Sequence, residues 1–292
     1  MNKRFLAILA ALLIPFLGNL NLLSAETKPD APTATTPPPT ASHMAVVKDL
    51  NDLIGRIKEK IAQRKQDEAD YADNFKELDA LLVKHKNADA DDRAEILMQK
   101  GIIYLEVLED PVKALPVFQQ IKTDFPSIQL NGNTDEFLAG VKEMADKKKI
   151  RDALVGVPFP DFNEKDIQGD ELSISKYKGK VVLLDFWATW CPPCVREVPD
   201  IQKLYNKYHS QGFEIVGISL DEEKDALENF VKQRKMPWPQ IFAGNRFENK
   251  LAIKYGIAFA PSTFLIGRDG KVVKQVMGTE ELDKELQSAL KK

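Results

Sequence analysis

Both cysteines of this 292-residue chain lie in one short stretch, FWATWCPPCVREVP, which runs from Phe186 to Pro199. Two prolines are all that separates Cys191 from Cys194. A chain with two cysteines has no disulfide framework that could staple a small core, so if the two pair at all, they pair with each other or with a client. This pair therefore constrains the fold and the chemistry of the chain more than any other feature.

The residues around the pair predict a buried strand that leads into a helix. Residues 181–188 form an apolar run of strand type, and residues 194–208 have a helical pattern. We expect Cys191 to cap this helix, with its sulfur facing the positive end of the helix dipole and the Cys194 amide. A thiol in that position has a lowered pKa and is partly ionised near neutral pH.

This arrangement predicts thiol–disulfide exchange. The Cys191 thiolate would attack a client disulfide, and Cys194, about one turn further along and more deeply buried, would resolve the mixed disulfide. Pro192 and Pro193 fit the first helical turn, where a missing amide costs little. Half of a zinc site is one alternative, but structural zinc sites take four ligands and the three histidines are scattered. An inert disulfide is another, although so short a loop adds little stability.

The second half of the chain alternates strands with helices. We expect a second strand at 213–220, helices at 225–235 and 247–255, a hairpin of strands at 262–267 and 271–277, and a closing helix at 280–290. This order predicts a mixed sheet in an α/β sandwich. Trp238, in the turn Met236-Pro237-Trp238-Pro239, is expected to pack in the core rather than to line a client pocket.

Residues 181–194 resemble the active-site strand and loop of thioredoxin-like proteins, and the second half of the chain resembles the exported TlpA/ResA type of thiol–disulfide reductase. The motifs that carry this resemblance are Gly179-Lys180, Arg196-Glu197-Val198-Pro199, Val216-Gly217-Ile218-Ser219, Tyr255-Gly256-Ile257, Pro261-Ser262-Thr263-Phe264-Leu265-Ile266 and Asp269-Gly270. The resemblance implies a thioredoxin-like fold for residues 151–292, and it says nothing about residues 45–150.

The resemblance also implies roles for individual residues. Pro261, preceded by Ala260, matches the family's cis-proline, which keeps a backbone edge open for a client peptide. Asp185 matches a buried acid beneath the dithiol, able to take the proton of Cys194; a solvated or paired aspartate is the alternative. Trp190 and Pro193 would contact the client, whereas Trp187 would pack in the core. The redox-active disulfide is the only redox group implied, with no further cofactor and no metal.

The N-terminal residues predict export. Residues 1–25 have the layout of a secretory signal peptide, with a basic start, an apolar run at 5–17 and Leu23-Ser24-Ala25 before a cleavage point. An uncleaved membrane anchor is the alternative, although a spanning helix needs about 20 consecutive apolar residues. Residues 26–44 are rich in Pro, Thr and Ala, which predicts a disordered linker. In a cell with two membranes the expected location is the periplasm, where cysteine pairs tend to oxidise.

Residues 45–150 predict an all-α domain. Apolar residues recur at spacings of three and four, as at Val47, Leu50, Ile54, Ile57 and Ile61, and Asp92-Arg93-Ala94-Glu95 predicts a helix start of capping-box type. Part of the region resembles a single tetratricopeptide repeat, with one extra residue in the turn around Asp110-Pro111. The matching residues are Leu97, Gly101, Tyr104, Ala114, Phe118, Ile121 and Pro126. A generic helical bundle is the alternative.

These expectations combine into an exported thiol–disulfide oxidoreductase, with reduction of client disulfides as the favoured direction. The partners would be oxidised client proteins and an upstream thiol or membrane electron donor, with a further partner docking on the helical domain. A net charge of −3 gives no reason to expect nucleic acid. A disulfide-forming oxidant, a peroxide reductase of peroxiredoxin type and a scaffolding module are the alternatives. The sequence names neither the client nor the redox potential.

Overall fold

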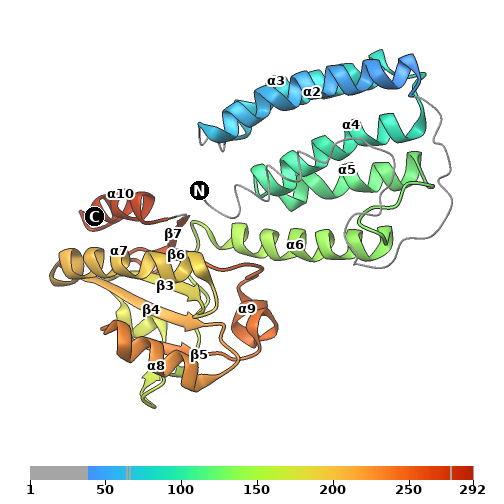
Figure 1. Ribbon diagram of the computed structural model, residues 1–292. Helices are drawn as coiled ribbons and strands as arrows, with labels where there is room; N and C mark the ends of the chain where they lie inside the picture. The colour runs from blue at the N-terminus through green and yellow to red at the C-terminus, as the bar shows by residue number, and fades with distance from the viewer. Residues whose placement is uncertain (1–38, 64, 66, 277, 292) are drawn as a thin grey trace. The chain divides into compact units, whose positions relative to one another are not determined.

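The computed structural model describes residues 39–63, 65, 67–276 and 278–291, and the chain divides into two compact units with the boundary between Ala145 and Asp146 (Figure 1). The predicted signal peptide, residues 1–25, and the predicted linker up to residue 38 lie outside the described residues. Within the described ranges, no helix combines the length and the apolar character that crossing a membrane requires.

The first unit is helical, as predicted. Its elements are α2 (Ala41–Ala62), α3 (Glu68–Lys84), α4 (Ala90–Ile102), a π-helical turn (Ile103–Val107), α5 (Pro111–Asp124) and the first part of α6 (Thr134–Leu154). One apolar cluster joins α2 and α3 to α4, and a second joins α4 and α5 to α6. Gly101 of α4 lies against Phe118 of α5 so closely that a Cβ at Gly101 would come within 2.4 Å of the ring.

Three local expectations for this unit are wrong. The predicted linker was to reach Met44, but α2 begins at Ala41, because the Thr40 hydroxyl caps it by accepting from the His43 amide at 3.1 Å. The helix start predicted at Asp92 lies two residues too late, since α4 begins at Ala90. Asp92 is buried and lies 2.7 Å from His43 instead of capping a helix.

The third expectation that is wrong concerns the extra residue of the tetratricopeptide-like pattern, which was expected in the turn around Asp110-Pro111. A π-helical turn, which holds one more residue than an α-helical turn, occurs earlier, at Ile103–Val107. The Asp110 side chain caps α5 by accepting from the amides of Val112 and Lys113. The turn itself holds Glu109 in a left-handed backbone conformation, with a φ of +49°, and the helix before it accommodates the extra residue.

The second unit has the thioredoxin-like architecture that was expected. A five-stranded mixed sheet has the order β5-β4-β3-β6-β7, and a two-stranded hairpin, β1-β2, precedes it. The strands are β1 (Glu164–Lys165), β2 (Glu171–Leu172), β3 (Val181–Trp187), β4 (Phe213–Ser219), β5 (Gln240–Phe242), β6 (Ser262–Ile266) and β7 (Val272–Val276). The helices are α7 (Pro192–Tyr208), α8 (Lys224–Arg234), α9 (Lys250–Lys254) and α10 (Thr279–Ala289).

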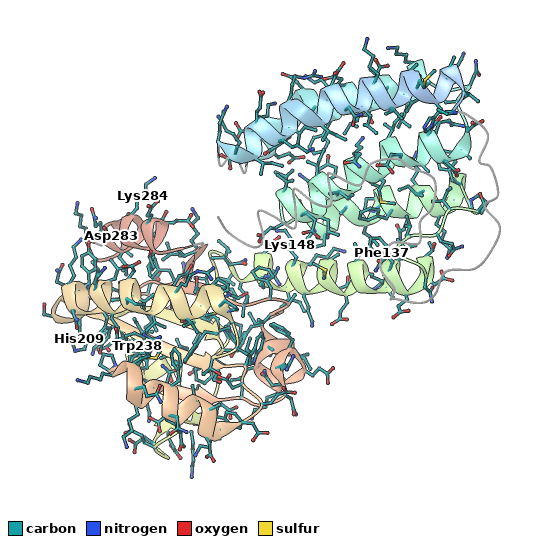
Figure 2. The ribbon with its side chains drawn as sticks, viewed as in Figure 1. Phe137, Lys148, His209, Trp238, Asp283 and Lys284 are labelled. Carbon is teal, nitrogen blue, oxygen red and sulfur yellow. A yellow bond between two sulfur atoms is a disulfide. The ribbon has the colours of Figure 1, made fainter. Side chains whose placement is uncertain are left out.

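Strand β3 is the centre of this sheet. It pairs in parallel with β4 and antiparallel with β6, and all seven of its residues are buried. Helices cover both faces, with α7 and α10 together on one side and α8 on the other (Figure 1). Asp283 of α10, which is labelled in Figure 2, accepts from the Tyr208 hydroxyl of α7 at 2.7 Å. A strand enclosed in this way holds the cysteine loop that follows it on a rigid base.

The tryptophans predicted for the core lie there. Trp187 is 1% exposed, packs against Phe230 of α8 and donates its indole N–H to the Gln240 side chain at 2.9 Å. Trp238, which is labelled in Figure 2, is 3% exposed and packs against Tyr205 of α7. Both side chains therefore stabilise the unit from within, and Trp238 lines no client pocket.

Candidate active site

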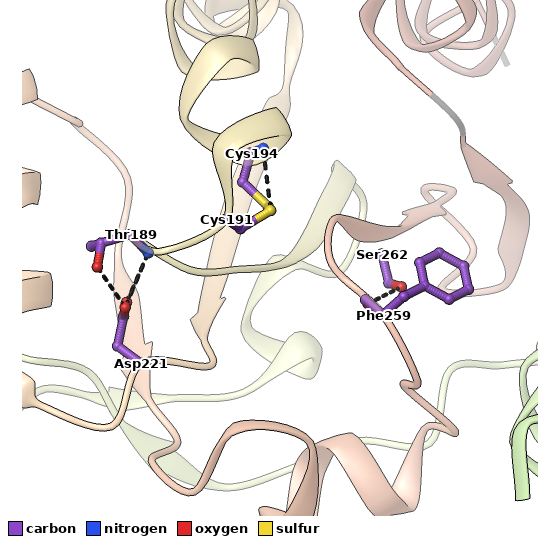
Figure 3. Close-up of a disulfide and its surroundings, with 6 residues drawn as sticks. All are labelled: Thr189, Cys191, Cys194, Asp221, Phe259 and Ser262. Atoms are coloured by element: carbon purple, nitrogen blue, oxygen red, sulfur yellow. Dashed lines mark hydrogen bonds between the residues drawn. A yellow bond between two sulfur atoms is a disulfide. The ribbon is translucent and has the colours of Figure 1, made fainter. Parts of the chain in front are cut away.

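The cysteine loop leaves the carboxyl end of β3 and enters α7 at Cys191 (Figure 3). Cys191 is the N-cap residue, and its sulfur accepts a hydrogen bond from the Cys194 amide at 3.3 Å. Pro192 and Pro193 occupy the first positions of the helix, where their missing amides leave no intrahelical bond unmade. The predicted cap is thus confirmed, and the two sulfurs are joined in a disulfide.

The expected difference in burial between the two cysteines is absent. Cys191 is 3% exposed and Cys194 is 4% exposed, so Cys194 is not the more deeply buried of the two in the disulfide form. The bond holds both sulfurs at the same helix end, which explains their equal burial. What distinguishes them is the amide hydrogen bond, which only the Cys191 sulfur accepts as the helix cap.

Asp185 lies in the middle of β3, between Gly217 of β4 and Thr263 of β6. It is 5% exposed, and within the described part of the chain its Oδ1 atom has no hydrogen-bond partner. Burial raises the pKa of this carboxyl to about 7, and the nearby charge of Glu197 on α7 contributes to the rise. Asp185 is therefore not a solvated surface aspartate, and its carboxyl can exchange a proton near neutral pH.

A second buried aspartate, which the sequence analysis did not single out, holds the loop before the cysteines. Asp221 follows β4 and is 1% exposed. Its carboxylate accepts from the Thr189 amide at 3.0 Å and from the Thr189 hydroxyl at 2.6 Å (Figure 3). It also accepts from the Ser219 hydroxyl at 2.7 Å. Because Thr189 lies two residues before Cys191, these bonds fix the path of the loop that presents the dithiol.

Trp190 lies at the surface beside the dithiol, as expected, with 41% of its side chain exposed. The Phe247 ring meets it edge to face at 6.1 Å between centroids, and the Arg246 guanidinium lies 5.1 Å from its ring centre. Arg246 also pairs with Glu222 at 2.8 Å. The indole is thus held in place by neighbours while its outer face stays open to solvent.

The segment before β6 completes the surroundings of the dithiol. The peptide bond between Ala260 and Pro261 is cis, as the resemblance implied. In the antiparallel register Ser262 pairs with Phe186, so Pro261 lies level with the end of β3, where the cysteine loop begins. The Ser262 hydroxyl donates to the Phe259 carbonyl at 2.7 Å (Figure 3). Ala260 and Pro261 are half-buried, which leaves part of each accessible.

The fold and the site together define a class of protein. A helix-capping cysteine with a second cysteine one turn away is the arrangement that thiol–disulfide exchange uses, and a cis-proline lies level with the same edge of the sheet. The second unit is that of a thioredoxin-like thiol–disulfide oxidoreductase.

Comparisons with known proteins give the narrower assignment. Residues 155–275 match the AhpC/TSA family. The thiol–disulfide oxidoreductase ResA of Bacillus anthracis is 38% identical over 148 residues, which cover 51% of this chain and 82% of ResA. ResA of Bacillus subtilis is 40% identical over 124 residues, or 42% of this chain and 68% of that one. The chain belongs to the family of ResA thiol–disulfide oxidoreductases.

Solved structures of similar proteins cover the same part of the chain. The thioredoxin domain of a thiol–disulfide oxidoreductase from Bacteroides vulgatus is 28% identical, with a TM-score of 0.42 over 46% of this chain and 96% of that one. A thiol:disulfide interchange protein of the thioredoxin family from Chlorobium tepidum is also 28% identical, with a TM-score of 0.42 over 46% and 96%.

Proposed function

We propose that this protein is an exported reductase of protein disulfides, in which Cys191 attacks and Cys194 resolves. The observation that carries the assignment of roles is the hydrogen bond from the Cys194 amide to the Cys191 sulfur at the start of α7. An amide donor and the positive end of a helix both stabilise a thiolate, so Cys191 is the better nucleophile at neutral pH.

The reaction passes two electrons from the dithiol to the client. The Cys191 thiolate attacks one sulfur of the client disulfide, which forms a mixed disulfide and releases one client thiolate. Cys194 then gives up its proton and attacks the Cys191 sulfur, which closes the intramolecular disulfide and releases the second client thiol. A thiol donor or a membrane electron donor returns two electrons to the pair. The cysteines themselves carry the electrons, and no further cofactor is required.

Asp185 is the proposed acceptor of the Cys194 proton. Its pKa of about 7 means that part of the population is ionised at neutral pH and that the protonated form is stable once the proton has arrived. Asp185 lies within β3, the strand that leads into the cysteine loop, and its carboxyl is close enough to Glu197 of α7 to be affected by that residue's charge. The unpartnered Oδ1 atom supports this role, because no hydrogen bond among the described residues must be broken when it takes a proton.

The proposed client contacts are Trp190, Pro193, Ala260 and Pro261. Trp190 offers an exposed aromatic face, and Pro193 is half-buried in the first turn of α7. The Ala260–Pro261 segment precedes β6 and offers backbone groups that an extended client segment can pair with. A client bound in this way would bring its disulfide to the Cys191 sulfur.

The helical unit is proposed to select a partner through a tetratricopeptide-like helix pair. The close packing of Phe118 against Gly101 supports this, because such repeats bring their two helices together at small residues. Export to the periplasm is supported by the sequence pattern of residues 1–25. Trapping clients with a Cys194→Ser variant, with and without the helical unit, tests the selection. An unchanged set of trapped clients would contradict this role.

The reduction potential of the Cys191–Cys194 couple tests the direction of the reaction. The couple is equilibrated against glutathione or dithiothreitol buffers and followed by the fluorescence of Trp190, with the Cys191→Ser variant as the control. A potential near or below about −250 mV, close to that of thioredoxin, is expected for a reductase. A potential near −120 mV, like that of DsbA, would instead identify a disulfide-forming oxidant. A peroxide-consumption assay on the same reduced protein tests the peroxide-reductase alternative.

A further inference from the structure

A buried arginine in the last turn of α6 contacts the segment that leads to the cis-proline. Arg151 is 4% exposed, and its Nη1 atom donates to the Gly256 carbonyl. The guanidinium carbon also lies 5.0 Å from the ring centre of Phe259, which stands two residues before Pro261. One side chain thus reaches this segment, residues 256–261, at two separate points.

The backbone of α6 also approaches this segment closely, at Gly256. Gly256 has a φ of +68°, and a Cβ at that position would lie 2.3 Å from the Lys147 carbonyl oxygen and 2.9 Å from the Ile150 Cβ atom. Glycine is therefore required both for the left-handed backbone and for the close approach. The segment therefore packs closely against the end of α6, and Arg151 of the same helix adds further contacts to it.

The segment that contains Ala260 and Pro261 is held by hydrogen bonds before and after these two residues. Arg151 fixes Gly256 and the Phe259 ring on one side, and the Ser262 hydroxyl holds the Phe259 carbonyl at 2.7 Å on the other. The planar shape of a guanidinium suits both a carbonyl and an aromatic face. Lysine would keep the charge but lose the flat surface that stacks on the ring.

We infer that Arg151 is a positioning residue for client binding, which holds the Phe259–Pro261 segment in the shape that receives the client backbone. Arg151 itself touches neither the cysteines nor, in the proposed reaction, the client disulfide. The inference rests on the proposed function and adds a specific structural requirement for client binding. Loss of Arg151 should weaken the binding of a protein client while leaving the chemistry of the dithiol intact.

The test compares the full-length Arg151→Lys variant with the wild-type protein on two disulfides of different size. Insulin serves as the protein disulfide, turned over with dithiothreitol as the electron source. 5,5′-Dithiobis(2-nitrobenzoate) is the small disulfide and needs no backbone contact. We expect the KM for insulin to rise about three- to tenfold, with kcat and the rate constant for the small disulfide each within about twofold of wild type. Arg234→Lys, which alters an arginine that lies 5.5 Å from the Phe230 ring, is the matched control and should change neither.

Each remaining outcome decides against the inference. If Arg151→Lys lowers the rates with insulin and with the small disulfide equally, the arginine serves stability alone. If it changes neither rate, the client-binding segment does not depend on Arg151. Should Arg151→Lys fail to fold, Phe259→Leu keeps the bond to Gly256 and removes only the stacked ring, and an unchanged KM for insulin would then overturn the inference. A wild-type protein that reduces neither disulfide would refute the proposed function itself, and with it the role of Arg151 in client binding.

Discussion

Two neighbouring strands each supply a buried aspartate to the active site, and the two carboxyls are in very different surroundings. Asp221, after β4, is 1% exposed and accepts three hydrogen bonds shorter than about 3.1 Å, from Thr189 and Ser219. Asp185, within β3, is 5% exposed and has an oxygen without a partner among the described residues. Burial alone therefore does not define what a carboxyl does. The donors around it decide whether it holds structure or exchanges a proton.

The largest effect is expected when Asp221 is removed. Asp221→Ala leaves the Thr189 amide, the Thr189 hydroxyl and the Ser219 hydroxyl without their acceptor, and we expect a loss of about 4 kcal/mol in the free energy of unfolding, measured with urea. The same change should alter the reactivity of the dithiol, because Thr189 positions the loop.

The matched control for this variant is Asp161→Ala. The Asp161 carboxylate also accepts several backbone amides, those of Phe162, Ile174 and Ser175, but it lies near the β1–β2 hairpin. Its loss should lower stability by a smaller amount, because Asp161 is exposed and water can replace it as the acceptor, and it should leave the reactivity of the dithiol unchanged. Equal effects of the two variants on that reactivity would mean that Asp221 has no special relation to the site.

The second prediction concerns the pH dependence of stability in the oxidised form. The pKa of Asp185 is about 7 in the folded protein, compared with about 4 in an unfolded chain. Between these values the folded protein keeps a proton that the unfolded chain has lost, so this group makes stability fall by roughly 1 kcal/mol per pH unit as the pH rises from 4 to 7.

Asp185→Asn should abolish that contribution. The variant should gain stability relative to wild type as the pH rises through this window, and above pH 7 the difference should remain constant. Urea unfolding of both proteins at several pH values measures it, and all other groups cancel in the difference. Two stability curves that run parallel from pH 4 to 8 would show that the pKa of Asp185 is ordinary.

The third prediction concerns the rate at which the mixed disulfide is resolved. Asp185→Asn removes the proposed acceptor of the Cys194 proton, and we expect resolution at pH 7 to slow at least tenfold, equivalent to about 1.4 kcal/mol. Stopped-flow release of the client thiol measures this step. Glu214→Gln is the control, because Glu214 is also buried in the sheet but pairs with Lys180 at the opposite end of β4. A rate unchanged by Asp185→Asn would assign the proton to another acceptor.

The smallest expected effect is a shift in the pH dependence of the resolution rate when the Glu197 charge is removed. Its charge contributes to the raised pKa of Asp185, so Glu197→Gln should lower the pH midpoint of the resolution rate by a few tenths of a unit. Asp200→Asn, an exposed change on the same helix, should leave the midpoint in place. If the two variants shift it equally, the coupling between Glu197 and Asp185 is not specific.

The parts of the fold that long local patterns encode were predictable from the sequence. Four of the five strands of the sheet were placed within about two residues, because apolar runs such as 181–187 and 213–219 are long and bounded by turns. The three-residue strand β5 (Gln240–Phe242) was not predicted, because so short a run carries no clear pattern. The Cys191 cap was predictable for the same reason, since a strand and a helix on either side leave one position for it.

What escaped the sequence analysis depends on pairing between distant segments. Asp221 follows a predicted strand, but its partner Thr189 is defined only when β3 and β4 lie side by side in parallel. A usable signal was present, because the carboxyl ends of adjacent parallel strands share one edge of a sheet. Arg151 offered none, since Gly256 lies 105 residues further along the chain. In the helical unit, Asp92 looked like a cap but contacts His43 instead.

The central position of β3 has a consequence for how the chain acquires its structure. Synthesis proceeds from the N-terminus, so Cys191 and Cys194 are complete before β6 and the Gly256 partner of Arg151 exist. Contacts between such distant segments form late, and until then the cysteines belong to an unfinished sheet. In that interval neither the edge of β6 nor the cis-proline segment encloses the two thiols. The dithiol site is therefore complete only when β6 pairs with β3.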